Sequence, residues 1–104
     1  MRIMHHRHLH THADDDLLLE AIAEQMRRID PRAERGAPVL VADLWRAVDR
    51  LFPGKDAFDA ALVRLERSNR LALVRHDSAM FAGEADETVL VFDGRMHYCG
   101  VALR

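Results

Sequence analysis

Two segments with apolar residues at helical spacing are separated only by Phe52-Pro53-Gly54, and this short break constrains the fold more than any other feature. In the first segment, roughly residues 41–51, apolar residues recur every three or four positions. In the second, roughly residues 55–68, the same spacing returns. This period places the apolar side chains on one face of a helix. The sequence therefore predicts two helices joined by a tight turn.

A further helix is predicted over residues 15–29. Its apolar residues recur at spacings of four, four and three: Leu18, Ile22, Met26 and Ile29. The acidic run at residues 14–16 is expected to cap this helix, because carboxylates favour a helix N-terminus. Pro31 ends it, because the residue before a proline avoids the helical conformation. Residues 30–38 are predicted to form a loop that leads into a short strand at Val39 and Leu40.

Asp93-Gly94 lies between two apolar stretches and predicts a β-hairpin of residues 88–92 and 95–103. Asp-Gly favours a hairpin loop of two residues. Such a loop pairs Val91 with Met96 on one side of the hairpin.

The other side of this hairpin is also partly apolar, because Leu90 and Phe92 point there in the predicted register. A strand over residues 71–76 is expected to come before the hairpin, after Asn69, which suits a left-handed helix end. Residues 77–87 lack a clean period and are expected to form an excursion. Either that excursion or a partner protein covers the apolar side of the hairpin.

The order helix, short strand, helix, tight turn, helix, strand, excursion and hairpin resembles the winged helix-turn-helix superfamily. The stretches that carry the resemblance are Val39–Trp45, Phe52–Gly54, Phe58–Leu65 and Ser68–Leu73. The resemblance implies an α+β fold of three helices with a small antiparallel sheet, the wing, over residues 14–104. The chain departs from the superfamily in an unusually long wing region and in the acidic start of the third helix.

The first thirteen residues contain five of the seven histidines: His5, His6, His8, His10 and His12. Apolar periodicity is absent from this stretch, so we expect a flexible tail over residues 1–13. Neutral imidazoles at short spacing also bind transition metals, which leaves metal binding as the alternative role of the tail.

The formal net charge is −2, which argues against indiscriminate binding to a polyanion. The charge is uneven along the chain. Residues 41–75 carry seven basic and five acidic side chains, a balance of +2, whereas residues 76–104 carry two basic and five acidic ones, a balance of −3. A local basic surface for nucleic acid therefore remains compatible with the acidic total.

The resemblance implies binding of double-stranded DNA, with the third helix in the major groove and the hairpin beside the backbone. The candidate nucleic-acid contacts are Lys55, Arg64, Arg67, Arg70, Arg75 and Arg95. Asp56 and Asp59 oppose this reading, because carboxylates at the start of the third helix repel phosphate, although they also stabilise a helix N-terminus. The arginines alternatively form an ordinary solvated face.

The second hypothesis is a winged-helix module that binds another protein. The candidate contacts are Ala60 and Val63 on the outer face of the third helix, and Leu90 and Phe92 on the hairpin. A homodimer through the first helix or the hairpin is compatible with either hypothesis. A continuous positive stripe from the third helix to the hairpin would favour DNA, whereas a mixed or negative face beside an apolar patch would favour a protein partner.

Enzymatic activity is not expected, because the sequence has neither a glycine-rich phosphate loop nor a nucleophile with a recognisable base. We likewise expect no cofactor, no metal centre in the folded domain and no small-molecule substrate. The single cysteine excludes an internal disulfide, and the apolar runs are too short to cross a membrane. These features predict a cytoplasmic protein.

Overall fold

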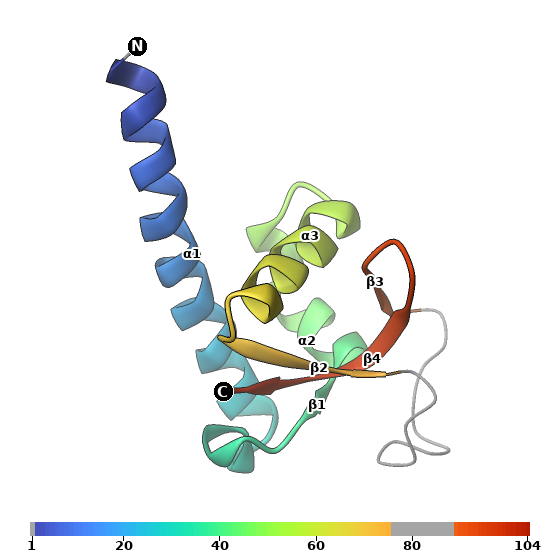
Figure 1. Ribbon diagram of the computed structural model, residues 1–104. Helices are drawn as coiled ribbons and strands as arrows, with labels where there is room; N and C mark the ends of the chain where they lie inside the picture. Colours follow the sequence, from blue (N-terminus) through green and yellow to red (C-terminus); the bar gives the residue numbers. More distant parts are fainter. Residues whose placement is uncertain (1, 76–88) are drawn as a thin grey trace.

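The structure, a computed structural model, describes residues 2–75 and 89–104, and for residues 2–13 it describes the backbone alone (Figure 1). The elements in chain order are α1 (Arg2–Ile29), the short 3-10 helix η1 (Pro31–Arg35), β1 (Val39–Leu40), α2 (Val41–Val48), the 3-10 turn η2 (Asp49–Leu51), α3 (Lys55–Arg67), β2 (Leu71–Arg75), β3 (Val91–Phe92) and β4 (His97–Leu103). Within the described residues, three α-helices and a four-stranded antiparallel sheet form an α+β, winged-helix-like fold, as predicted.

Helix α1 is longer than the sequence pattern predicts, because it begins at Arg2 rather than near residue 15. The expectation that residues 14–16 cap the helix is wrong, since these aspartates lie within it. Neither proline nor glycine occurs before Pro31, so no strong helix breaker lies ahead of the apolar face. The first turns of α1 project beyond the rest of the fold (Figure 1). A separate flexible tail over residues 1–13 stays a prediction.

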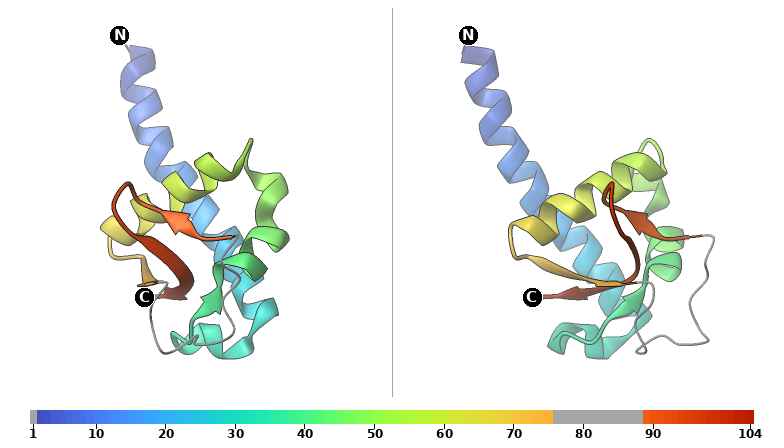
Figure 2. Two further views of the ribbon diagram at one scale, coloured as in Figure 1. Left: turned by 90° about the vertical axis from the view of Figure 1, so that its right-hand side faces the viewer. Right: turned by 45° about the vertical axis from the view of Figure 1, so that its right-hand side comes forward.

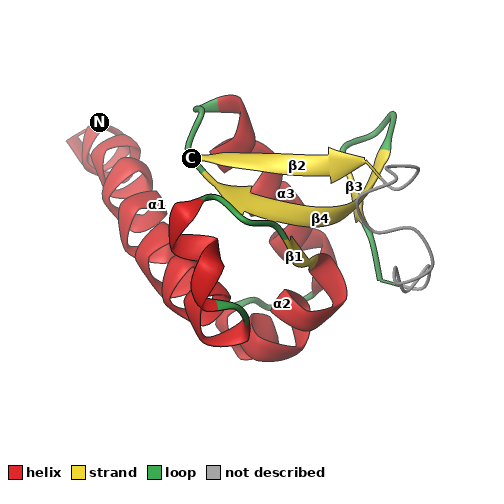
Figure 3. Ribbon diagram, turned by 90° about the horizontal axis from the view of Figure 1, so that it is seen from below, coloured by secondary structure: helices red, strands yellow, loops and turns green. Residues whose placement is uncertain are grey.

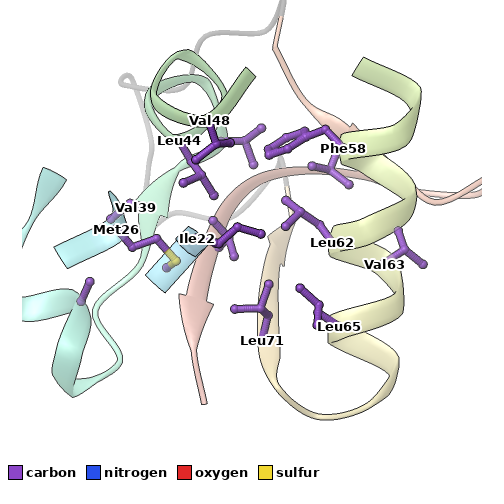
Figure 4. Close-up of a cluster of buried hydrophobic side chains, with 14 residues drawn as sticks. Ile22, Met26, Val39, Leu44, Val48, Phe58, Leu62, Val63, Leu65 and Leu71 are labelled. Atoms are coloured by element: carbon purple, nitrogen blue, oxygen red, sulfur yellow. The ribbon is translucent and has the colours of Figure 1, made fainter. Parts of the chain in front are cut away.

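The predicted apolar faces of the three helices meet in one core, as the close-up in Figure 4 shows. The largest fully buried side chains include Ile22 and Met26 from α1, Leu44 from α2, and Phe58 and Leu62 from α3. Burial of each such side chain contributes roughly 1.5–3 kcal/mol relative to leaving it in water. The sheet closes the same core from its side with residues of β2, β3 and β4: Leu71, Val91 and Val101.

Three aromatic rings fix the junction between α2 and α3. The Trp45 ring lies 4.9 Å from the Phe58 ring, centroid to centroid, and the Phe52 and Phe58 rings meet edge to face at 5.4 Å. Trp45, the only tryptophan, is partly buried against the core. The short turn between the two helices therefore carries one of its own residues, Phe52, into the packing that orients them.

The strand β4 is the centre of the sheet, because β1, β2 and β3 all pair with it (Figure 3). Asn69 precedes β2 with a φ of 62°, which confirms the left-handed conformation predicted for the end of α3. The pairing of β2 with β4 is irregular between Val74 and Arg75, where the register shifts. Such irregularities bend a strand, and β4 continues past this point towards β3.

The predicted hairpin register is wrong by two residues. Val91 pairs with Tyr98 rather than Met96, so residues 93–96 form a four-residue loop instead of a two-residue turn. The cause is the Asp93 carboxylate, which accepts hydrogen bonds from the backbone amides of Arg95 and Met96, both at 2.8 Å. A shift of two residues preserves the faces of a strand. Val91 therefore remains buried, and the alternation predicted for β3 is confirmed.

Candidate interaction surface

A groove of about 530 Å³ runs between α3 and the β3–β4 hairpin, which lie alongside each other in Figure 2. Its lining residues are Asp56, Asp59, Ala60, Val63, Arg64, Arg67, Phe92 and Asp93. The groove therefore joins the two elements that the sequence predicts to carry function, the third helix and the wing.

The hairpin is fastened to α3 by Lys55 and Asp59. The Lys55 ammonium donates to the Asp59 carboxylate at 2.6 Å and to the backbone carbonyl of Leu90. The other oxygen of Asp59 accepts a hydrogen bond from the backbone amide of Phe92 at 3.3 Å. The Lys55 ammonium also lies 5.6 Å from the centre of the Phe58 ring. Lys55, a candidate DNA contact, is thus engaged in holding β3 in place.

Two other candidate DNA contacts are paired with acidic residues of α1. Arg64 donates to both carboxylate oxygens of Asp15, at 2.8 and 3.3 Å. This hydrogen bonding raises the pKa of the Arg64 guanidinium above its usual value. Arg70 forms an ion pair with Asp16. The two pairs link α1 to the end of α3 and the start of β2, and they neutralise positive charge that DNA phosphates would need.

The remaining three candidate arginines lie around the contact between Asp93 and Tyr98: the charge of Arg67 acts on Asp93, Arg75 pairs with Tyr98 in the sheet, and the Arg95 amide bonds to Asp93. Arg67 lines the groove and makes no ion pair with a side chain in the described ranges. Arg75 ends β2, and its carbonyl accepts a hydrogen bond from the Cys99 thiol at 3.5 Å. Arg95 is exposed in the hairpin loop.

Asp93 adds a fixed negative charge at the hairpin end of the groove. Hydrogen bonds from the amides of Met96 and Arg95 and from the Tyr98 hydroxyl, 2.9 Å away, lower the pKa of Asp93 to about 2. The nearby charge of Arg67 acts in the same direction. The hydrogen bond between Tyr98 and Asp93 raises the pKa of Tyr98, because an ionised tyrosine could no longer donate to the carboxylate. Asp93 is therefore ionised at neutral pH.

The apolar part of the groove consists of Ala60 and Phe92, with Val63 at its floor. Phe92 is 45% exposed and stacks on the His97 ring at 4.6 Å. The prediction that Val63 is exposed is wrong, since only 8% of it is accessible to solvent. Val63 instead belongs to the buried core cluster, although it also lines the groove. Leu90 is half-buried, and residues 77–87, which are one of its two predicted covers beside a partner protein, lie outside the described part of the chain.

The lining of the groove is mixed in charge, with three aspartates against two arginines. Of these, Asp59 is paired with Lys55 and Arg64 with Asp15. The sequence pattern correctly located α3 and the hairpin. It missed Asp15, Asp16 and Tyr98, whose roles depend on contacts between elements. The short spacing from Asp93 to Tyr98 was the one local signal that could have indicated the last of these.

In the ranges 14–75 and 89–104, no group of three or more His, Cys, Asp or Glu side chains is arranged to hold a metal ion. Of the helices in the part of the chain that the structure covers, none combines the length and apolar composition that crossing a bilayer requires. Comparisons of the chain with known protein families, with curated proteins and with solved structures found no match.

Proposed function

We propose that this chain is a protein-interaction module with a winged-helix-like fold, and that it binds its partner through the groove between α3 and the β3–β4 hairpin. The observation that carries the proposal is the pairing of Arg64 with Asp15 and of Arg70 with Asp16. Two of the six candidate DNA contacts are thereby neutralised on the surface where a winged helix would meet DNA.

Electrostatics at the groove favours a protein over a polyanion. DNA binding draws its affinity largely from lysine and arginine that neutralise phosphates. Here a phosphate approaching α3 would meet Asp56, Asp59 and Asp93, and it would have to displace Asp15 from Arg64. Asp56 and Asp93 repel phosphate, whereas the charge of Asp59 is already offset by Lys55. Clefts favour ligands of the opposite charge, and the residues that line this one carry no net positive charge.

The apolar centre of the groove is typical of a protein interface. An exposed aromatic ring, Phe92, lies beside Ala60 and is surrounded by charged residues. Protein interfaces commonly place aromatic side chains at the centre and polar groups at the rim. The winged-helix DNA-binding hypothesis remains the competing proposal, and one titration separates the two.

The test is a titration of a fluorescent DNA duplex of mixed sequence with the full chain, measured by anisotropy at low salt. A DNA-binding winged helix binds even non-specific duplex with a dissociation constant of roughly 10⁻⁴–10⁻⁶ M or tighter under these conditions. We expect no saturable binding up to about 100 µM protein. Micromolar binding that weakens steeply with salt and disappears in R64A/R67A, but not in the control R50A, would overturn the proposal.

A further inference from the structure

One face of α3 carries four groove residues in a single line. Asp56, Ala60, Val63 and Arg67 occupy positions i, i+4, i+7 and i+11 of the helix and all line the groove. At about 100° per residue they fall within about 60° of one another, and at 1.5 Å per residue they span about 16 Å. The line has an acid at its N-terminal end, two apolar residues in the middle and a base at its C-terminal end.

The charged ends of this line, Asp56 and Arg67, are exposed, and the charge of Arg67 also acts on nearby Asp93. Among the described residues, neither the Asp56 carboxylate nor the Arg67 guanidinium takes part in a hydrogen bond or ion pair, in contrast to Asp59 and Arg64 beside them. The central Ala60 is exposed and small, so another backbone can approach α3 closely there.

This pattern is complementary to itself when it is reversed. If a second α3 lies antiparallel across the line, Asp56 faces the partner's Arg67 and Arg67 faces the partner's Asp56. The exposed Ala60 then lies over the partner's Val63, of which only 8% is accessible. An isologous two-fold interface requires this kind of self-complementary patch. Antiparallel helices also place opposite ends of their dipoles side by side, which is favourable.

We propose that the groove binds a second copy of this chain, with the two α3 helices antiparallel about a two-fold axis. This inference rests on the proposed function, because it names the partner of the same groove. It differs from a dimer through α1 or through the hairpin alone, since the charges that specify it lie on α3.

A helix suits this groove better than an added strand. The outward backbone groups of the hairpin at Leu90 and Phe92 are already bonded to Lys55 and Asp59. An extended segment would therefore find no free edge to pair with, whereas a helix satisfies its own backbone hydrogen bonds. In the dimer, the partner's helix covers Phe92, the exposed ring at the groove wall.

The experiment reverses one of the two charges in each of two variants, D56R and R67D, and measures their self-association by sedimentation equilibrium. D56R places arginine opposite the partner's arginine in both halves of its homodimer, and R67D places aspartate opposite aspartate. We expect each variant alone to dimerise at least tenfold more weakly than the wild type. An equimolar mixture of D56R and R67D should restore dimerisation, because both charge pairs in the mixed dimer are then opposite in sign.

The controls are D49R and R50D, which make the same charge changes at exposed positions of η2 outside the groove. Both should associate like the wild type. Thermal unfolding of each variant, followed by circular dichroism, verifies that it is folded. A wild type that stays monomeric up to about 500 µM overturns the dimer, and so does a mixture that associates no better than its components.

The two proposals fail separately. If the wild type is monomeric and does not bind DNA, the dimer is excluded, and the proposal that the groove binds a different protein still stands. If the wild type binds DNA and R64A/R67A does not, the proposed function as a protein-interaction module is overturned, whatever the charge-exchange experiment shows.

Discussion

At the scale of single residues, Asp93 organises the hairpin loop. Its carboxylate accepts hydrogen bonds from two backbone amides and from the Tyr98 hydroxyl, and Gly94 beside it adopts a φ of 98°. Any residue other than glycine is strained at that φ. Asp-Gly correctly indicated a turn here, but not its length, because several loop types use the same residues and the side-chain bonds decide among them.

Tyr98, the only tyrosine, reports on this contact. Its pKa is raised above the ordinary value of 10.0 by the bond to Asp93, so the stabilisation that the bond provides is present below pH 10 and is lost as pH rises through the raised pKa. We expect D93N to lower the midpoint of the Tyr98 titration, measured by near-ultraviolet absorbance. D30N, which removes an aspartate that Arg32 binds, should leave the midpoint unchanged. Equal midpoints in wild type and D93N would contradict the bond.

Acid should destabilise the same hairpin loop by protonating Asp93. The pKa of Asp93 is lowered from 3.8 to about 2, so its stabilising hydrogen bonds are complete above pH 4 and are lost as pH falls from about 4 to 2. The loss follows from protonation, which removes the charge that the amides and the hydroxyl stabilise.

At the scale of elements, helix periodicity predicted the fold well. The apolar faces of α1, α2 and α3 all enter the core, because a 3.6-residue period encodes burial directly in the sequence. Short strands carry much less information, and β3 has only two residues. Val63 was assigned to the outer face because the angle around one helix does not reveal which residues of other elements bury it.

The substitution of phenylalanine by alanine at two positions tests which aromatic residue holds the elements together. Phe58 is fully buried in the ring cluster, so F58A should lower the free energy of unfolding by about 3–5 kcal/mol. F92A removes a ring that is 45% exposed and should cost about 1 kcal/mol or less. Denaturant unfolding followed by Trp45 fluorescence measures both. Similar losses in the two variants would contradict the described core.

At the scale of the whole molecule, the distribution of charge could not be predicted from the sequence. Asp15 and Arg64 are 49 residues apart in the chain, and only the docking of α1 on α3 brings them together. The charge balance of residues 41–75 looked favourable for DNA because the counter-charges lie in another segment. The sequence therefore placed α3 and the hairpin correctly as elements, but the charge of the groove between them depends on tertiary contacts.

Removal of those counter-charges should change what the surface attracts. D15N/D16N frees Arg64 and Arg70 and brings the formal net charge from −2 to 0. We expect weak, salt-sensitive affinity for duplex DNA to appear, with a slope near −1.8 in the logarithm of the binding constant against that of salt if both arginines meet phosphates, about −0.9 for each. Anisotropy titrations at several salt concentrations measure it.

The matched control for this change is E24Q/D43N, which gives the same net charge but releases Arg28 and Arg46 instead. It should gain no comparable affinity. If both double variants bind DNA equally, total charge rather than the position of the two ion pairs governs the behaviour of the surface.

The central position of β4 has a consequence for the order in which the chain folds. In the described sheet, every pairing uses residues 97–103, and the partner of Val39 is Val101. Closing so long a loop costs chain entropy that only the completed pairing repays. During synthesis on the ribosome, we therefore expect the helices to collapse together first, and the sheet to form in one late step once β4 has emerged from the exit tunnel.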